Sequence, residues 1–164
     1  MSNAPILVLT TGGTIDKQYF DALSEYQVGE TAVGMLLRMA RVAAPFRIEE
    51  VLRKDSLELT DADRALIAAK VAKAPETHIV ITHGTDTMTD TAQVLAGIEG
   101  KTVVLTGALA PARFAESDAA FNLGMAFAAA QTCAPGTYIA MSGQVFDGLK
   151  VRKDRAAGKF MPID

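Results

Sequence analysis

ILVLTTGG, residues 6–13, places four apolar residues before two threonines and two glycines. A short run that is apolar at every position suits a strand buried on both faces, as in a parallel sheet. The same pattern recurs at 79–81, 103–105 and 138–141, whereas residues 46–52 alternate less cleanly and indicate a more exposed strand. The interior of this protein is therefore expected to be a sheet of buried strands.

Helical patterns lie between these runs. Residues 30–42 repeat apolar side chains at helical spacing, and residues 117–131 form an alanine-rich stretch. Positions 60–63 (TDAD) have the spacing of a helix-capping box, and positions 87–90 (TMTD) repeat that signal. The alternation predicts an α/β fold, with an open, mainly parallel sheet flanked by helices and joined by right-handed crossovers.

Two segments depart from this alternation. Asp147-Gly148 separates two short apolar runs within residues 144–151, which predicts a β-hairpin near the C-terminus. Residues 16–29 show weak periodicity, and loops of that length without regular structure often act as lids.

Composition excludes several classes of protein. The length of 164 residues fits a single domain over 1–164, and a net charge of −3 without a basic run makes nucleic acid an unexpected partner. The lone Cys133 and the two histidines lack the spacing of a metal site, so no metal is expected. Residues 1–11 lack a cationic signal-peptide region, and no apolar run approaches a bilayer span. No membrane association and a cytoplasmic location are therefore expected.

The ends of the predicted strands share a composition. Each of four apolar runs ends in a hydroxyl residue that is followed by a glycine, either directly or after one residue: Thr11-Gly12, Thr82-His83-Gly84, Thr106-Gly107 and Ser142-Gly143. One such junction would simply open a turn. Because the carboxyl ends of parallel strands lie at one edge of a sheet, where ligands bind, four junctions in register favour a binding site.

Two threonines stand out at this edge. Thr14 follows the double glycine, and Thr85 precedes Asp86 at a predicted helix start. A threonine hydroxyl is a poor nucleophile unless a base activates it, and a free aspartate is a weak base near neutral pH. A desolvated lysine can serve as that base, with Asp86 orienting it. Lys150 and Lys153 are the candidates. An ordinary helix N-cap is the alternative role for Asp86.

TTGGTI at 10–15 and ITHGTDTM at 81–88 resemble the two signature motifs of the bacterial-type L-asparaginases and glutaminase-asparaginases. The stretches KDS at 54–56, LTGA at 105–108 and VFDG at 145–148 support the resemblance, which extends along essentially the whole chain in order and approximate spacing. It implies the N-terminal α/β domain of that family.

The resemblance also implies catalytic roles. Thr14 matches the primary nucleophile, and Tyr26 matches a lid tyrosine that contacts it. Thr85, Asp86 and Lys153 match a second triad, which activates a hydroxyl or a water. The implied reaction is the hydrolysis of L-asparagine to L-aspartate and ammonia through an acyl-threonine, with no metal or organic cofactor.

The implied substrate-binding residues suit a zwitterion. Ser56 matches the residue that holds the α-carboxylate, and Asp86 matches the partner of the α-amino group. Ala108 matches the residue whose carbonyl positions the side-chain amide, and Thr85 belongs to the same set. A zwitterion needs an anionic partner for its ammonium and hydrogen-bond donors for its carboxylate, and a carboxylate and hydroxyl groups supply these.

The sequence departs from the family in ways that keep alternatives open. Relatives run to about twice this length, with a second domain that helps to complete a neighbouring subunit's active site, which implies a homo-oligomer (dimer or tetramer). Leu57 stands where many relatives carry a polar residue that touches the substrate, and Asp16 where a small residue is usual. A non-catalytic amino-acid-binding or regulatory module is one alternative, and a glutaminase is another. His83 is expected to be a hydrogen-bonded structural residue rather than a base.

Overall fold

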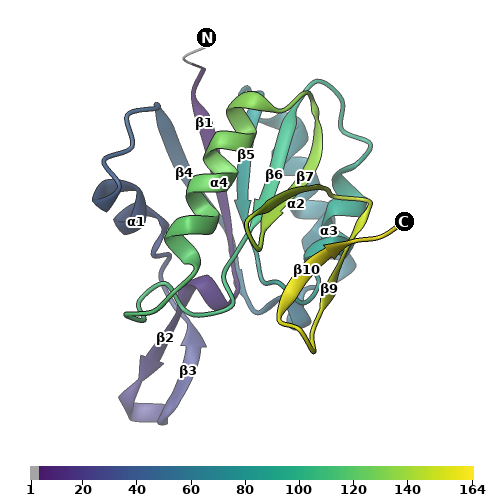
Figure 1. Ribbon diagram of the computed structural model, residues 1–164. Helices are drawn as coiled ribbons and strands as arrows, with labels where there is room; N and C mark the ends of the chain where they lie inside the picture. The colour runs from purple at the N-terminus through teal and green to yellow at the C-terminus, as the bar shows by residue number, and fades with distance from the viewer. Residues whose placement is uncertain (1–3) are drawn as a thin grey trace.

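The protein, seen here as a computed structural model that describes residues 4–164, is a six-stranded sheet with helices on both faces (Figure 1). The strands in spatial order are β4 (Phe46–Lys54), β1 (Ile6–Gly12), β5 (His78–Thr82), β6 (Thr102–Thr106), β7 (Gly136–Met141) and β8 (Gln144–Asp147). The helices are α1 (Val33–Met39), α2 (Asp61–Lys73), α3 (Met88–Leu95) and α4 (Ala119–Thr132). Expectations about residues 1–3 lie outside the described part of the chain.

The sheet confirms the predicted α/β class. All pairings from β4 to β7 are parallel, and β8 adds an antiparallel edge to β7. Every residue of β1 is buried, as two-sided apolar runs require, whereas the edge strand β4 is only partly buried.

Side chains of the strands divide between two cores. Ile6 and Val8 of β1 face α1 and α4, while Leu7 and Leu9 face α2 and α3. Burial of each such side chain is worth about 1.5–3 kcal/mol. The two-sided core is what holds the carboxyl ends of the strands in place.

The crossover through α4 is left-handed, which corrects the expectation of right-handed crossovers throughout. Helix α3 joins β5 to β6 over one face, and α4 joins β6 to β7 over the opposite face in the same direction across the sheet. The two connections therefore have opposite hands. On the face that α4 covers, Val80, Val104 and Ala140 would otherwise be exposed, which is a physical reason for the rare hand.

The predicted β-hairpin near the C-terminus is confirmed, but the prediction that it turns at Asp147-Gly148 is wrong. Strand β8 pairs back on β7 through Ser142-Gly143, whose φ angles of 54° and 74° suit a tight hairpin turn. A second hairpin pairs β9 (Val151–Asp154) with β10 (Lys159–Pro162). Asp147 instead accepts a hydrogen bond from the Leu149 amide, and at this turn the chain passes from one hairpin to the next.

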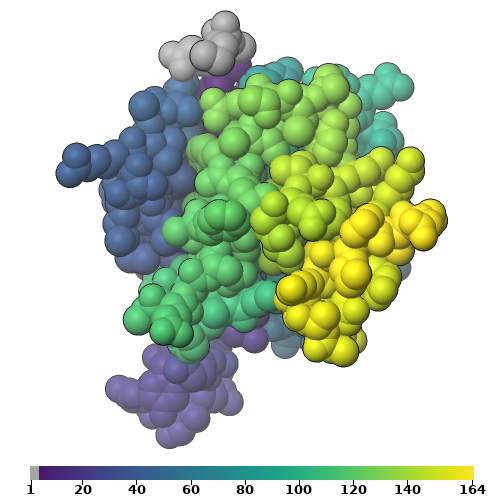
Figure 2. All heavy atoms as spheres, in the orientation of Figure 1, coloured from purple at the N-terminus to yellow at the C-terminus, as the bar shows by residue number. Residues whose placement is uncertain are grey.

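The segment predicted as a loop is also a hairpin. Strands β2 (Lys17–Phe20) and β3 (Glu25–Val28) pair antiparallel; the 3₁₀ turn η1 (Thr14–Asp16) precedes β2, and the 3₁₀ turn η2 (Asp21–Leu23) connects the two strands. This hairpin projects from the body of the protein (Figures 1 and 2). Among residues 4–164, the longest apolar helices still fall short of crossing a membrane.

Candidate active site

The candidate site lies where the strand order of the sheet reverses. From β1 the chain passes to β4 on one side and then to β5 on the other, so β1 and β5 flank the switch point at which ligands of such sheets bind. The loops after these strands touch: a Cβ on Gly13 would lie 2.5 Å from the Gly84 nitrogen. Glycine is therefore required at position 13 by this contact and by its φ of 86°. The two motifs, far apart in sequence, thus meet at one point.

Lys153 joins Thr85 and Asp86 in a cluster of polar side chains. Its Nζ donates to Thr85 Oγ1 at 2.8 Å and to Asp86 Oδ1 at 2.8 Å. The Lys153 side chain is 17% exposed and Thr85 is buried, so this contact is largely shielded from water. Lys150, the other lysine considered from the sequence, is exposed. Lys153 of β9 thus contacts Thr85 and Asp86 in the loop that follows β5.

A second cation also reaches Asp86. Arg155 Nε lies 3.4 Å from Asp86 Oδ1, the same oxygen that Lys153 contacts. Sequence reasoning missed Arg155, because a lone arginine beyond the matched lysine carries no local signal of this contact.

Ser56 lies against the same loop. A Cβ on Gly84 would lie 2.5 Å from Ser56 Cβ, so the 3₁₀ turn η3 (Ser56–Glu58) packs directly on the second motif. Ser56 is 1% exposed, and its Oγ has no hydrogen-bond partner among the described residues. A buried hydroxyl without a partner is costly, so this atom is suited to a ligand.

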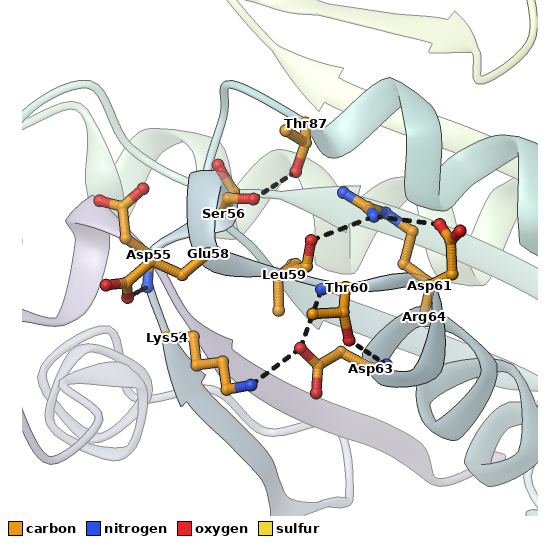
Figure 3. A network of polar contacts seen from close by, with 10 residues as sticks. All are labelled: Lys54, Asp55, Ser56, Glu58, Leu59, Thr60, Asp61, Asp63, Arg64 and Thr87. Atoms are coloured by element: carbon orange, nitrogen blue, oxygen red, sulfur yellow. Dashed lines mark hydrogen bonds and ion pairs between the residues drawn. The ribbon is translucent and has the colours of Figure 1, made fainter.

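Several contacts hold the Ser56 turn (Figure 3). Thr87 Oγ1 donates to the Ser56 carbonyl at 2.8 Å. Asp55 Oδ1 accepts from the Leu57 amide at 3.1 Å. Asp55 and Glu58 form a capping box around the turn. The predicted capping box of Thr60 and Asp63 at the start of α2 is confirmed, whereas the one predicted at Thr87 is wrong, because Thr87 bonds to Ser56 instead.

Asp55 also joins this turn to the β2–β3 hairpin. Lys17 Nζ lies 3.0 Å from Asp55 Oδ2. Burial raises the pKa of the Asp55 carboxyl, but hydrogen bonds from the Leu57 amide and from Lys17 outweigh burial and leave that pKa below its ordinary value. The carboxylate is therefore charged at neutral pH and holds both partners.

Ala108 lies in the loop after β6 and is buried. The loop is fixed from α4, because Asn122 Nδ2 donates to the Gly107 carbonyl at 2.9 Å. Asp118 accepts hydrogen bonds from the amides of Leu109 and Ala110. The backbone around Ala108 is thus held by the start of α4.

Thr14 and Tyr26 are less closely joined to this cluster. Thr14 begins η1 directly after Gly13 and is partly buried. Tyr26 is 51% exposed on β3, with its ring 5.3 Å from that of Tyr19 and 5.6 Å from that of Phe114. Among the described residues, no hydrogen bond joins Tyr26 to Thr14. The structure therefore brings Thr85, Asp86 and Lys153 into direct contact, and leaves Tyr26 on the projecting hairpin.

Two buried titratable groups flank the site. Burial lowers the pKa of His83 to about 4, and both ring nitrogens are hydrogen-bonded: Nδ1 donates to the Gly84 carbonyl and Nε2 accepts from Thr91. His83 is therefore neutral, in line with a structural role. Burial raises the pKa of Asp16 to about 6, although the Ala32 amide and Thr31 hydroxyl donate to it. Within residues 4–164, no group of three acidic, His or Cys side chains is placed to hold a metal ion.

Fold and site together define an α/β protein with a Lys–Thr–Asp cluster at the switch point of a mainly parallel sheet. The family described as "Asparaginase, N-terminal" matches residues 5–159. The chain therefore belongs to the asparaginase N-terminal domain family, which confirms the resemblance seen in its motifs.

Curated relatives support this assignment. The chain is 32% identical over 165 residues to an L-asparaginase of Thermococcus kodakarensis, covering 93% of this chain and 48% of that protein. It is 34% identical over 159 residues to L-asparaginase 2 of Escherichia coli, covering 90% and 46%. It is 30% identical over 162 residues to a glutaminase-asparaginase of Pseudomonas aeruginosa, covering 90% and 45%. The chain thus spans about half the length of these relatives.

Solved structures are similar over nearly the whole chain. The thermostable L-asparaginase from Thermococcus kodakarensis superimposes with a TM-score of 0.83 at 30% identity, covering 97% of this chain and 51% of that one. A probable cytoplasmic L-asparaginase from Campylobacter jejuni gives 0.79 at 28% identity, covering 97% and 51%.

Proposed function

We propose that this protein hydrolyses L-asparagine to L-aspartate and ammonia through an acyl-threonine intermediate. The observation that carries the proposal is the position of Lys153 Nζ, 2.8 Å from both Thr85 Oγ1 and Asp86 Oδ1 at the sheet edge. Membership of the asparaginase family and the names of the relatives support the choice of reaction.

The proposed reaction has two steps. In the first, Thr14 Oγ1 attacks the side-chain amide carbon, the C–N bond breaks, and the hydroxyl proton leaves with the nitrogen as ammonia. In the second, water attacks the ester carbon and the bond from that carbon to Thr14 Oγ1 breaks. The proton of the water passes through Thr85 and Lys153 to Thr14 Oγ1, which frees L-aspartate and restores the Thr14 hydroxyl. Backbone amides near Thr14 and Thr85 would stabilise the oxyanion of each step. Tyr26 would contact Thr14 when the hairpin closes.

Substrate binding is proposed to use groups of both signs. Asp86 would hold the α-ammonium, and the unpartnered Ser56 Oγ would donate to the α-carboxylate. Thr85 would line the pocket, and the Ala108 carbonyl would position the side-chain amide. No cofactor is required by these steps.

Removal of either proposed catalytic group tests the reaction. Thr14→Ala and Lys153→Met should each lower the rate of ammonia release from L-asparagine by about 100-fold or more, because a nucleophile or a proton relay is lost. Lys150→Met is the matched control, since Lys150 lies in the same segment but is exposed, and it should keep the wild-type rate. Ammonia is measured in a coupled assay, with circular dichroism to verify folding.

The outcomes separate the candidate functions. Full activity of Thr14→Ala would refute the role of Thr14. Binding of L-aspartate by calorimetry without ammonia release would favour the non-catalytic binding module, which the exposed Leu57 also suits. Faster ammonia release from glutamine than from asparagine would favour a glutaminase, and the Pseudomonas aeruginosa relative is named for both substrates.

Three further expectations belong to this proposal. The chain is proposed to form a single domain over 1–164, to assemble as a homo-dimer or homo-tetramer, and to act in the cytoplasm without binding nucleic acid or membranes. The name of the Campylobacter jejuni structure supports the cytoplasmic location. Fluorescence microscopy of a tagged chain tests that location.

A further inference from the structure

Arg155 places a second positive charge on Asp86, and the proposed mechanism does not use it. Its Nε lies 3.4 Å from Asp86 Oδ1, and Lys153 Nζ lies 2.8 Å from the same oxygen. Two cations therefore face one carboxylate at the position where the proposed function places a substrate ammonium.

The two cations are held differently. Lys153 has a second partner in Thr85, and its side chain is 17% exposed. The Arg155 side chain is 67% exposed, and Asp86 is the one partner that its guanidinium has among the described residues. The turn that carries Arg155 is held by a hydrogen bond from the Ala157 amide to Asp154 Oδ1 at 3.1 Å. The backbone is thus fixed, while the Arg155 guanidinium is free to leave Asp86.

We propose that Arg155 is a specificity-determining residue that competes with a ligand's ammonium for Asp86. An ammonium that arrives at Asp86 is repelled by the positive charge of Arg155 and competes with it for the carboxylate. A dicarboxylate of the same length without the ammonium meets no such competition, and Arg155 attracts it. The site therefore favours ammonium-free dicarboxylates and their monoamides more than a site without Arg155 would. This inference rests on the proposed function, because that function assigns the ammonium to Asp86.

Two ligands that differ in one group test the competition. L-Aspartate and succinate share two carboxylates on a four-carbon chain, and only L-aspartate carries an ammonium. Their affinities for wild-type protein and for Arg155→Ala are measured by calorimetry. The ratio of L-aspartate affinity to succinate affinity should rise about two- to fivefold in Arg155→Ala, the size expected from loss of one exposed ion pair.

Arg152→Ala is the matched control. Arg152 lies on β9, the strand that leads into the turn of Arg155; its side chain is 55% exposed and lies 4.0 Å from Asp154 rather than near Asp86. Its removal changes the net charge equally, so it reports the effect of charge alone, and the ratio should stay at the wild-type value.

The possible results are distinct. A ratio in Arg155→Ala that is unchanged or lower, or an equal rise in Arg152→Ala, would overturn the inference. Failure of both ligands to bind any form would overturn it as well. If the wild-type protein binds both ligands but releases no ammonia from L-asparagine, the hydrolytic function fails while the ratio still decides the role of Arg155.

Discussion

Asp16 shows how burial acts on a single side chain next to the candidate site. It is 2% exposed, and its carboxyl accepts hydrogen bonds from the Ala32 amide at 2.9 Å and the Thr31 hydroxyl at 3.1 Å. Desolvation outweighs these hydrogen bonds and raises its pKa to about 6. The side chain thus anchors the start of α1 at the cost of burying a charge at neutral pH.

The pH dependence of stability follows from this pKa. Between about pH 4 and pH 6 the folded protein keeps a proton on Asp16 that the unfolded chain releases, so the free energy of unfolding falls as pH rises through this window. Asp16→Asn keeps the acceptor and removes the charge. It should therefore raise the free energy of unfolding by about 1–3 kcal/mol at pH 8 and by much less at pH 4. Urea denaturation across this range measures the difference.

Asp21→Asn serves as the control, because Asp21 is exposed and should leave the pH profile unchanged. A uniform loss of stability in Asp16→Asn at every pH would show that the carboxylate is needed for its contacts and that its charge carries no penalty.

His83 acts with the opposite sign in an overlapping window. Its pKa of about 4 lies below the ordinary value, so the unfolded chain binds a proton first as pH falls from about 6.5. Its contribution therefore destabilises the folded state as pH falls toward 4. The two buried groups offset each other in part, which makes single variants necessary to separate them.

At the scale of elements, close packing of turns positions the site. The loop after β5 and the turn η3 touch at Gly84 and Ser56, whereas Gly124 in the middle of α4 has open space around it. The same substitution at these two glycines therefore has opposite physical consequences.

Gly84→Ala should lower the free energy of unfolding by about 1–3 kcal/mol, because its Cβ would lie 2.5 Å from Ser56 Cβ and 2.6 Å from Ser56 Oγ. Gly124→Ala should raise it by about 0.5–1 kcal/mol, since alanine loses less backbone entropy in a helix. Chemical denaturation measures both. A Gly84→Ala protein as stable as the wild type would show that the turn moves aside at little cost.

For the whole molecule, the exposed apolar surface argues for self-association. Phe121 is 64% exposed, and Leu109 is 43% exposed. Both line a hollow of about 540 Å³ between α4, the β7–β8 turn and the β9–β10 hairpin. In Figure 2, α4 and the C-terminal strands form one face, and the β2–β3 hairpin stands apart from the body. The hollow also carries polar side chains such as Asp118 and Lys159, so it offers a second copy of the chain both apolar and polar contacts.

Light scattering should therefore give a mass two or four times the 17.3 kDa of the chain. The expected assembly buries Phe121, so its accessibility to a quencher of fluorescence in a Phe121→Trp variant should be low. A fully active monomer would contradict the proposed homo-oligomer.

Local patterns in the sequence determined much of this protein. The runs that are apolar at every position predicted the buried strands, and the capping box of Thr60 and Asp63 predicted the start of α2. Both signals come from residues that are neighbours in the sequence. The motifs around Thr14 and Thr85 identified the family and the edge of the sheet that carries the site. These features depend on residues within a few positions of each other.

Only the tertiary structure decided which distant groups meet. The tertiary structure has a hairpin turn at Ser142-Gly143 and none at Asp147-Gly148, and α4 lies on the opposite face of the sheet from α3. It also placed Arg155 on Asp86 and Thr87 on Ser56, where the sequence alone indicated neither contact. Such pairings depend on strand order and core packing over tens of residues, since a local pattern states which face of an element is apolar and leaves open which partner covers it.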